Sequence, residues 1–229
     1  MTKHFCWEVA AAVCMMALSN CAAVAGESTA PWRGDFIGRL EALALLQSLN
    51  AELLSHDSAT LTLDRWCQAH SLASPAHITA ERVRGDKRPS DEVRSRLNVG
   101  PSEDVRYRNV RLRCGSHILS EADNWYVPAR LTPEMNRELD TTDTAFGRAV
   151  QGLHFQRHTL SAKLLWNPLP EGWEMSPVRA PFQADQSLAP SAHVIEHRAV
   201  LTSPDGTPFS EVVEDYTGEV LAFPEPFRP

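Results

Sequence analysis

Motifs that mark the common catalytic sites are missing from this sequence of 229 residues. It contains no G-x-S-x-G, no G-x-x-x-x-G-K-S/T, no G-x-G-x-x-G and no C-x-x-C. These patterns carry the nucleophile elbow, the phosphate-binding loop, the dinucleotide site and the dithiol redox site. The sequence therefore gives no support to these four classes of chemistry, and no internal repeat or low-complexity tract takes their place.

An excess of basic residues is also missing. The chain has 22 Lys and Arg against 29 Asp and Glu, which gives a formal net charge of -7. Proteins that bind nucleic acid normally carry a basic surface. The charge therefore argues against a nucleic-acid partner and against adhesion to an anionic membrane.

The apolar run near the N-terminus, residues 9–18, is too short to span a bilayer comfortably. Lys3 precedes it and Ala23-Val24-Ala25 follows it, a pattern typical of a secretory signal peptide. We expect residues 1–25 to be cleaved, with Gly26 as the first mature residue and the periplasm as destination. The alternative is a lipoprotein with a lipid anchor at Cys21, although Asn20 stands where such proteins carry a small residue.

Cysteine is scarce in the expected mature chain, where only Cys67 and Cys114 remain. In an oxidising compartment the two could pair, and closing a loop of about fifty residues would stabilise the fold by roughly 3–4 kcal/mol. The alternative is two buried, unpaired thiols, because sequence gives no Cα separation. Both readings are open at this point.

Hydrophobic periodicity predicts two helices followed by several strands. Leucines at three- and four-residue steps give a helix from Asp35 to Leu54. A second helix begins at Ser58 or Thr60 and reaches about His70, and Thr132 caps a third over 132–139. Alternating and β-branched runs predict extended segments at 77–83, 105–113, 125–127, 151–166, 194–201 and 209–216. The order indicates an α+β fold, an antiparallel β-sheet with helices packed on one face.

One domain over residues 32–222 accommodates these elements, with 223–229 as a C-terminal tail. Gly85 to Pro101 is polar, and its only periodic part is a short helix at 91–97, so we expect a mobile surface excursion. The five prolines of residues 168–190 indicate a long loop.

Arginines on strand positions are the strongest candidates for a site. Arg108 shares a strand face with Val110 and Leu112, and Arg157 also lies among apolar neighbours. A buried guanidinium needs an anion, because an unpaired buried charge is costly. The anion is either an internal carboxylate, Glu214 or Glu211, or a ligand carboxylate held in bidentate fashion.

Two histidine pairs at four-residue spacing, His154 with His158 and His193 with His197, lie in strand-like runs. Residues i and i+4 of a strand are about 13 Å apart. The sequence therefore predicts no metal site at either pair.

Five segments in order resemble the chorismate lyase family, whose fold is shared with ligand-sensing domains of some bacterial transcription regulators. The segments are Leu54-Ser55-His56-Asp57-Ser58-Ala59-Thr60, Arg106-Tyr107-Arg108-Asn109-Val110-Arg111-Leu112, Tyr126-Val127-Pro128, Thr144-Ala145-Phe146-Gly147-Arg148, and Gly206-Thr207-Pro208 through Glu214-Asp215-Tyr216. The order and spacing of the five carry the resemblance, since each alone is unspecific.

The resemblance implies a chorismate lyase-like fold and a site for a small aromatic or carboxylic acid. Arg108 would hold the ligand carboxylate and Glu214 would meet the hydroxyl at the far end of the ring, the two catalytic candidates. Phe146 and Arg157 would complete the substrate contacts. Glu81 falls near the place of a flap methionine, where its charge would repel a dianion. Glu211 is the fallback for Glu214, whose placement requires one inserted residue.

Activity of this family eliminates pyruvate from chorismate to give 4-hydroxybenzoate and needs no metal or cofactor. Positioning and charge complementarity would supply the catalysis. Export sets this chain apart, because chorismate is a cytoplasmic metabolite. A non-catalytic periplasmic binding or sensing protein of the same fold, or an envelope scaffold protein with an internal Arg108–Glu214 salt bridge, are the alternatives.

Overall fold

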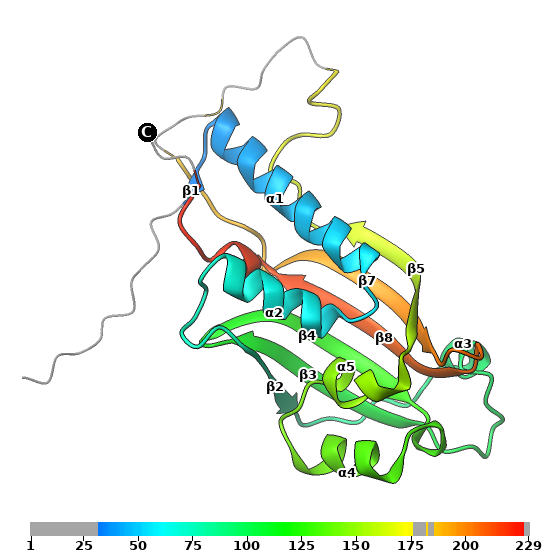
Figure 1. Cartoon of the computed structure of the whole chain (residues 1–229). Helices are drawn as coiled ribbons and strands as arrows, with labels where there is room; N and C mark the ends of the chain where they lie inside the picture. The colour runs from blue at the N-terminus through cyan, green and yellow to red at the C-terminus, as the bar shows by residue number, and fades with distance from the viewer. Residues whose placement is uncertain (1–31, 176–181, 183–185, 227–229) are drawn as a thin grey trace, which may run out of the picture.

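A six-stranded antiparallel β-sheet is the centre of the computed structural model, which describes residues 32–175, 182 and 186–226 (Figure 1). The strands follow the order β2-β3-β4-β8-β7-β5 across the sheet. Gly115 and Gly206, both at positive φ, turn the chain between β3 and β4 and between β7 and β8. The bounds are Ile78–Val83 (β2), Arg106–Cys114 (β3), His117–Tyr126 (β4), Gln156–Leu164 (β5), His193–Thr202 (β7) and Pro208–Thr217 (β8).

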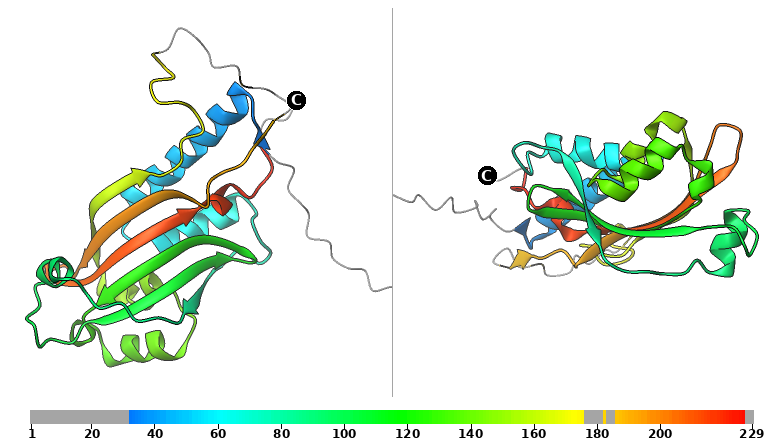
Figure 2. Two further views of the ribbon diagram at one scale, coloured as in Figure 1. Left: turned by 180° about the vertical axis from the view of Figure 1, so that it is seen from behind. Right: turned by 90° about the horizontal axis from the view of Figure 1, so that it is seen from below.

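Helices α1 (Phe36–Ser55), α2 (Ala59–Ala69), α4 (Pro133–Thr141) and α5 (Phe146–Ala149) lie over one face of this sheet, called here the inner face (Figure 2). The side chains of Asp35 and Ser58 cap α1 and α2 by accepting hydrogen bonds from the amides of Gly38 and Leu61. The predicted α+β fold with an antiparallel sheet is therefore confirmed. Short 3-10 turns occupy Pro128–Arg130 (η1), Gln151–Leu153 (η2) and Gly218–Leu221 (η3).

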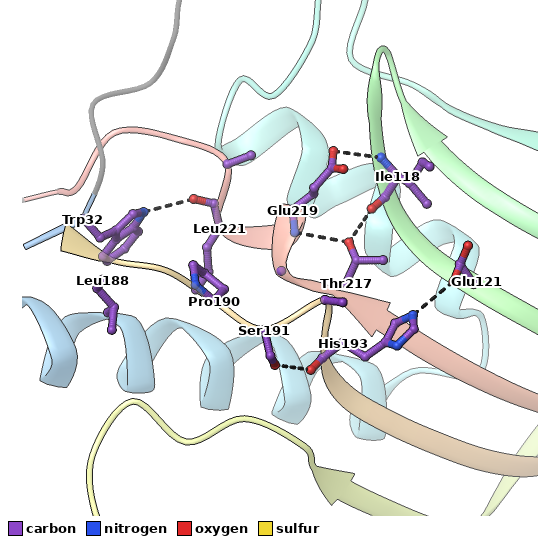
Figure 3. A pocket seen from close by; sticks show the side chains of 13 residues that line it. Trp32, Ile118, Glu121, Leu188, Pro190, Ser191, His193, Thr217, Glu219 and Leu221 are labelled. Carbon is purple, nitrogen blue, oxygen red and sulfur yellow. Dashed lines mark hydrogen bonds and ion pairs between the residues drawn. The ribbon is translucent and has the colours of Figure 1, made fainter. Parts of the chain in front are cut away.

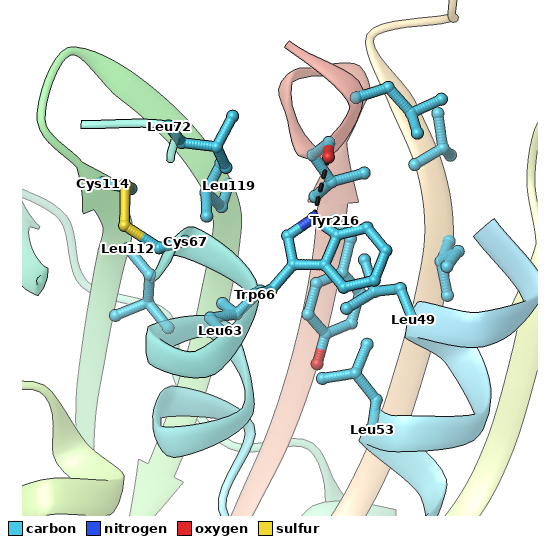
Figure 4. Packing of buried hydrophobic residues seen from close by; sticks show 14 of the residues in the cluster. Leu49, Leu53, Leu63, Trp66, Cys67, Leu72, Leu112, Cys114, Leu119 and Tyr216 are labelled. Atoms are coloured by element: carbon cyan, nitrogen blue, oxygen red, sulfur yellow. Dashed lines mark hydrogen bonds between the residues drawn. A yellow bond between two sulfur atoms is a disulfide. The ribbon is translucent and has the colours of Figure 1, made fainter. Parts of the chain in front are cut away.

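The main hydrophobic core lies between α1, α2 and the inner face (Figure 4). Leu49, Leu53 and Leu63 are fully buried there, and the indole of Trp66 donates to the carbonyl of Val220 at 2.9 Å. A disulfide between Cys67 and Cys114 joins α2 to β3, with 6.2 Å between the two Cα atoms. The pairing that the sequence left open is thus made in the structure.

The chain beyond residue 222 belongs to the domain. Phe223 is buried and packs edge-on against Trp32, and Glu225 is buried and accepts two hydrogen bonds from Arg33. The predicted boundary at 222 is therefore too early. Trp32–Arg33 (β1) also pairs with Ser187–Leu188 (β6), within the segment expected to be a loop.

Helix α3 (Asp91–Arg96) is the exception to the layering, because it packs on the outer face of the sheet (Figure 2). Val93 and Leu97 are buried against Trp125 and Val127. The predicted short helix is present in the surface excursion over 85–101. Val93 and Leu97, four residues apart, pack this part of the excursion onto the sheet.

Register places one charged side chain from each strand in a single row across the outer face. Asp215 is flanked by carboxylates on both neighbouring strands and makes no ion pair within the described part of the chain. Burial raises the pKa of Asp215; His193 opposes the rise, and the neighbouring acids, first Glu196, add to it. The row runs Glu81, Arg111, Glu121, Asp215, Glu196, Lys163.

We expect Asp215→Asn to raise the free energy of unfolding at pH 7 by about 0.5 kcal/mol, the scale of partly exposed charge interactions. Because its folded pKa lies above the ordinary 3.8, the carboxyl stabilises the fold below 3.8 and loses this contribution as pH rises through the folded pKa. Urea unfolding between pH 3 and 7 would show a flatter profile in the variant. Asp205→Asn is the control of opposite sign, because a hydrogen bond from the Thr207 amide lowers the pKa of Asp205.

Candidate functional site

A small, partly open cavity lies where the inner face of the sheet meets the beginning of α2 and α5. Its volume is about 40 Å³, room for roughly three water molecules. Ionic and hydroxyl groups line part of the wall, and aromatic and aliphatic side chains line the rest. The lining residues are Asp57, Ser58, Ala59, Thr60, Val110, Leu112, Ala122, Asn124, Phe146, Gly147, Phe155, Arg157, Leu201, Val212 and Glu214.

A buried ion pair forms one end of the cavity. Nη2 of Arg157 donates to Oε2 of Glu214 at 2.6 Å, and the two side chains are 4% and 8% exposed. The hydroxyl of Tyr216 donates to the same oxygen at 2.9 Å. Burial lowers the pKa of Arg157, but Glu214 more than offsets this and the net direction is upward. Within the described ranges, Oε1 of Glu214 makes no hydrogen bond and is free to accept one.

Arg108 is buried to 4% exposure on β3, so the predicted inward orientation is confirmed. Its Nη1 donates to the carbonyl of Leu139 at 3.2 Å and its Nη2 to the carbonyl of Thr144 at 3.0 Å. No carboxylate among the described residues pairs with it, and its Nε lacks a partner there. Burial, and then the charge of Arg82, lower the pKa of Arg108. Of the two kinds of anion left open for the inward arginines, an internal carboxylate therefore does not pair with Arg108, whereas Glu214 does pair with Arg157.

The cavity does not extend to Arg108, although it reaches close neighbours of that residue. Asn124 faces Arg108 in the β3–β4 register and lines the cavity, as does Val110 two residues along the strand. Phe146 also lines it, with its ring 5.5 Å from that of Tyr126. The structure thus brings Arg157, Glu214 and Phe146 together and leaves Arg108 just outside.

Two predicted site residues lie on the wrong side of the sheet. Glu81 pairs in register with Arg111, whose side chain lies on the face of β3 opposite to that of Arg108. Nη1 of Arg113 donates to Glu81 at 2.6 Å. Glu211 is buried on the outer face, where Arg96 and Arg198 donate to it at 2.7 and 2.9 Å. Neither can contact a ligand in the cavity, so both predictions are corrected by strand alternation.

Two residues of the site were missed from the sequence. Tyr216 lies two positions beyond Glu214, which places it on the same face of β8. His197 faces Glu214 from β7, is fully buried, and its Nε2 lies 2.8 Å from the amide oxygen of Asn50. Burial lowers the pKa of His197, so the ring is neutral at pH 7. The alternation of side chains along β8 could have predicted that Tyr216 shares the face of Glu214. Predicting His197 requires the strand order, because His197 lies on β7.

A larger, open groove of about 550 Å³ lies at the end of the sheet beside η3 (Figure 3). Trp32, Leu188 and Leu221 give it an apolar side, and the indole of Trp32 donates to the carbonyl of Leu221. Its polar end holds His193, whose Nε2 lies 3.0 Å from Glu121. These polar groups already bond one another, so the buried guanidinium of Arg108, which has no carboxylate partner among the described residues, is the stronger chemical signal.

Comparison with curated proteins gives one close relative. The chain is 58% identical over 197 residues to the uncharacterized protein y4mC from Sinorhizobium fredii, a match that covers 85% of this chain and 83% of that protein. No family model matches the sequence.

Solved structures give more distant likenesses. The effector domain of PhnF from Mycobacterium smegmatis is 13% identical, with a TM-score of 0.44 over 71% of this chain and 90% of that one. The possible transcriptional regulator YydK from Bacillus subtilis is 17% identical, with a TM-score of 0.38 over 64% of this chain. The match spans 61% of the YydK chain, less than two thirds of its length. TM-scores below 0.5 do not establish a shared fold, so the α+β assignment stands on the strand order itself.

None of the helices in the described part of the chain combines the length and the apolar character that crossing a bilayer requires.

Proposed function

The chain belongs to the family of the Sinorhizobium fredii protein y4mC, and on this premise we propose that the domain binds a small monocarboxylic acid with an aromatic or similarly flat apolar body. One observation carries the proposal. Arg108 is a buried guanidinium with no carboxylate partner among the described residues, and it adjoins a cavity with apolar walls. A buried charge without a counterion is costly, and a planar carboxylate matches the guanidinium in bidentate geometry.

The opposite end of the cavity favours a ligand with a hydroxyl. Oε1 of Glu214 can accept a hydrogen bond while Oε2 stays with Arg157 and Tyr216. Because Glu214 offsets the charge of Arg157, Arg108 is the buried guanidinium of this region that has no carboxylate partner among the described residues. The charge balance therefore favours a monoanion such as 4-hydroxybenzoate.

Pyruvate elimination from chorismate is the second candidate, supported by the position of Glu214 opposite Arg108 in the manner the family resemblance implies. The charge balance speaks against it, because chorismate carries two carboxylates and the cavity adjoins one buried guanidinium that lacks a carboxylate partner among the described residues. Incubation of the protein with chorismate, with 4-hydroxybenzoate followed by chromatography, separates the candidates. Product formation that Glu214→Gln abolishes would favour the lyase.

Export to the periplasm remains part of the proposal. The Cys67–Cys114 disulfide supports it, since such bonds persist in oxidising compartments. The predicted signal peptide of residues 1–25 and the lipoprotein alternative at Cys21 lie outside the described residues. Mass analysis of the N-terminus of the protein recovered from cells distinguishes them, and an intact residue 1 would contradict both.

We expect Arg108→Met to weaken 4-hydroxybenzoate binding by roughly 10- to 150-fold, because a charge-assisted hydrogen bond contributes about 1.5–3 kcal/mol. Titration calorimetry measures the affinity, with 4-hydroxybenzamide as the uncharged analogue that the wild type binds weakly. Arg111→Met is the matched control, because it removes the same charge from the same strand but on the outer face. Equal affinity of wild type and Arg108→Met would overturn the proposed function.

A further inference from the structure

Three arginines from β2 and β3 converge on the C-terminal end of α4. Nη1 of Arg82 donates to the carbonyl of Asp140 at 2.8 Å, and Nη1 of Arg106 lies 3.2 Å from the carboxylate of the same residue. Arg108 completes the group through the carbonyl of Leu139. The last carbonyls of a helix carry a partial negative charge. The end of α4 therefore offers these guanidinium groups the negative charge that a bound anion would offer.

Two of the five N–H donors of Arg108 are therefore already taken by the chain itself. The carbonyls of Leu139 and Thr144 take one donor from each of its two terminal nitrogens, the atoms that an end-on carboxylate would use. The cavity stops short of this guanidinium. An end-on ligand carboxylate therefore competes with these two carbonyls for the terminal nitrogens, and it takes their place when the end of α4 withdraws.

The chain on either side of the segment 132–144 is anchored by contacts that do not involve α4. Before it, Arg130 donates to the carbonyls of Leu97 and Pro208. After it, Arg148 donates to the carbonyl of Ile78 at 3.1 Å and pairs with Asp64. These anchors belong to η1 and α5 and do not depend on α4.

Helix α4 itself contributes little to the core. Leu139 is its one buried residue, and Asn136 tethers its first turn by donating to the carbonyl of Pro128 at 2.9 Å. The amide of Ala80 donates to the carbonyl of Asp143 just beyond the helix. A helix with one buried side chain between two fixed anchors can move without disturbing either.

We propose that residues 132–144 form a lid that competes with the ligand for Arg108 and withdraws when a carboxylate binds. The inference rests on the proposed function, because it assigns a regulation to the same site. With the lid closed, main-chain carbonyls satisfy the buried guanidinium; with the lid open, the ligand does. The measured affinity equals the intrinsic affinity multiplied by the fraction of molecules whose lid is open.

Leu139→Ala tests the lid, because it removes the one buried anchor of α4 and leaves the competing carbonyl in place. If the open fraction of the wild type is about one tenth, opening the lid tightens 4-hydroxybenzoate binding by up to about tenfold. Leu49→Ala is the matched control: the same substitution at a buried helical site in the main core, with lower stability but no gain in affinity expected. Asn136→Ala weakens the same lid without touching the core, and we expect a smaller gain.

Hydrogen exchange gives a second readout. Saturating 4-hydroxybenzoate is expected to speed amide exchange over residues 133–144 of the wild type while the strands are unchanged or slower. Unchanged or weaker binding in both Leu139→Ala and Asn136→Ala, or slower exchange in α4 with ligand, would overturn the lid. If Arg108→Met binds 4-hydroxybenzoate as well as the wild type does, the proposed site is wrong, and the proposed lid, which depends on that site, is wrong too.

Discussion

Glu214→Leu is expected to lower the free energy of unfolding by about 3–5 kcal/mol, the usual cost of leaving one member of a buried ion pair without its partner. Arg157 is 4% exposed on its side chain, and its Nε already lacks a hydrogen bond to the described residues. Losing Glu214 would leave this buried positive charge without its ion-pair partner. It would also remove the acceptor of the Tyr216 hydroxyl. Urea unfolding followed by circular dichroism measures the loss.

The double variant Arg157→Met/Glu214→Leu separates an uncompensated charge from a simple loss of packing. Replacing both partners by apolar side chains of similar size is often neutral, so we expect the double variant to recover most of the stability. Glu196→Leu is the exposed comparison, since its pair with Lys163 is 60% exposed on the lysine side and breaking it costs at most about 1 kcal/mol. A double variant as unstable as Glu214→Leu would rule out the charge explanation.

Removing the disulfide has the second large effect. Cys67 and Cys114 are 47 residues apart in sequence, and the loop-entropy relation gives about 4 kcal/mol for a cross-link of that length. We expect Cys67→Ala/Cys114→Ala to lose about that much in free energy of unfolding, measured in urea without reductant.

A reductant provides the internal control for this prediction. Reduction of the wild type should lower its midpoint of unfolding toward that of the double variant, whereas the double variant should not respond. Equal midpoints for oxidised wild type and double variant would mean that the cross-link does not constrain the unfolded chain. Both cysteines are fully buried, so a reductant reaches the disulfide only after partial unfolding, and reduction is slow.

Alternation along β3 was enough to predict that Arg108 points inward with Val110 and Leu112. The same rule separates Glu214 from Glu211, because residues three apart on a strand face opposite sides. It also excludes Glu81 once the register with Arg111 is known. The partner of Arg108 could not be predicted, because it is a pair of main-chain carbonyls that have no signature in the side chains.

The Arg157–Glu214 pair depends on strand order rather than on either local sequence. Arg157 lies on β5 at the edge of the sheet and Glu214 on β8, with β7 between them. The sequence offered Glu214 as one possible partner for an inward arginine, but no pattern in 151–166 or 209–216 shows which arginine it meets across a third strand. Likewise, the burial of Phe223 and Glu225 follows from contacts with Trp32 and Arg33 at the other end of the domain.

The strand order also has a consequence for how the molecule assembles. Strands β3 and β4 form one hairpin and β7 and β8 another, and the two hairpins meet along β4 and β8, where Ala122 faces Glu214. Hairpins form within microseconds, whereas a seam between distant parts of the chain must first bring those parts together. Arg108 belongs to the first hairpin and Glu214 to the second. The two ends of the proposed ligand site therefore come together only when β4 pairs with β8.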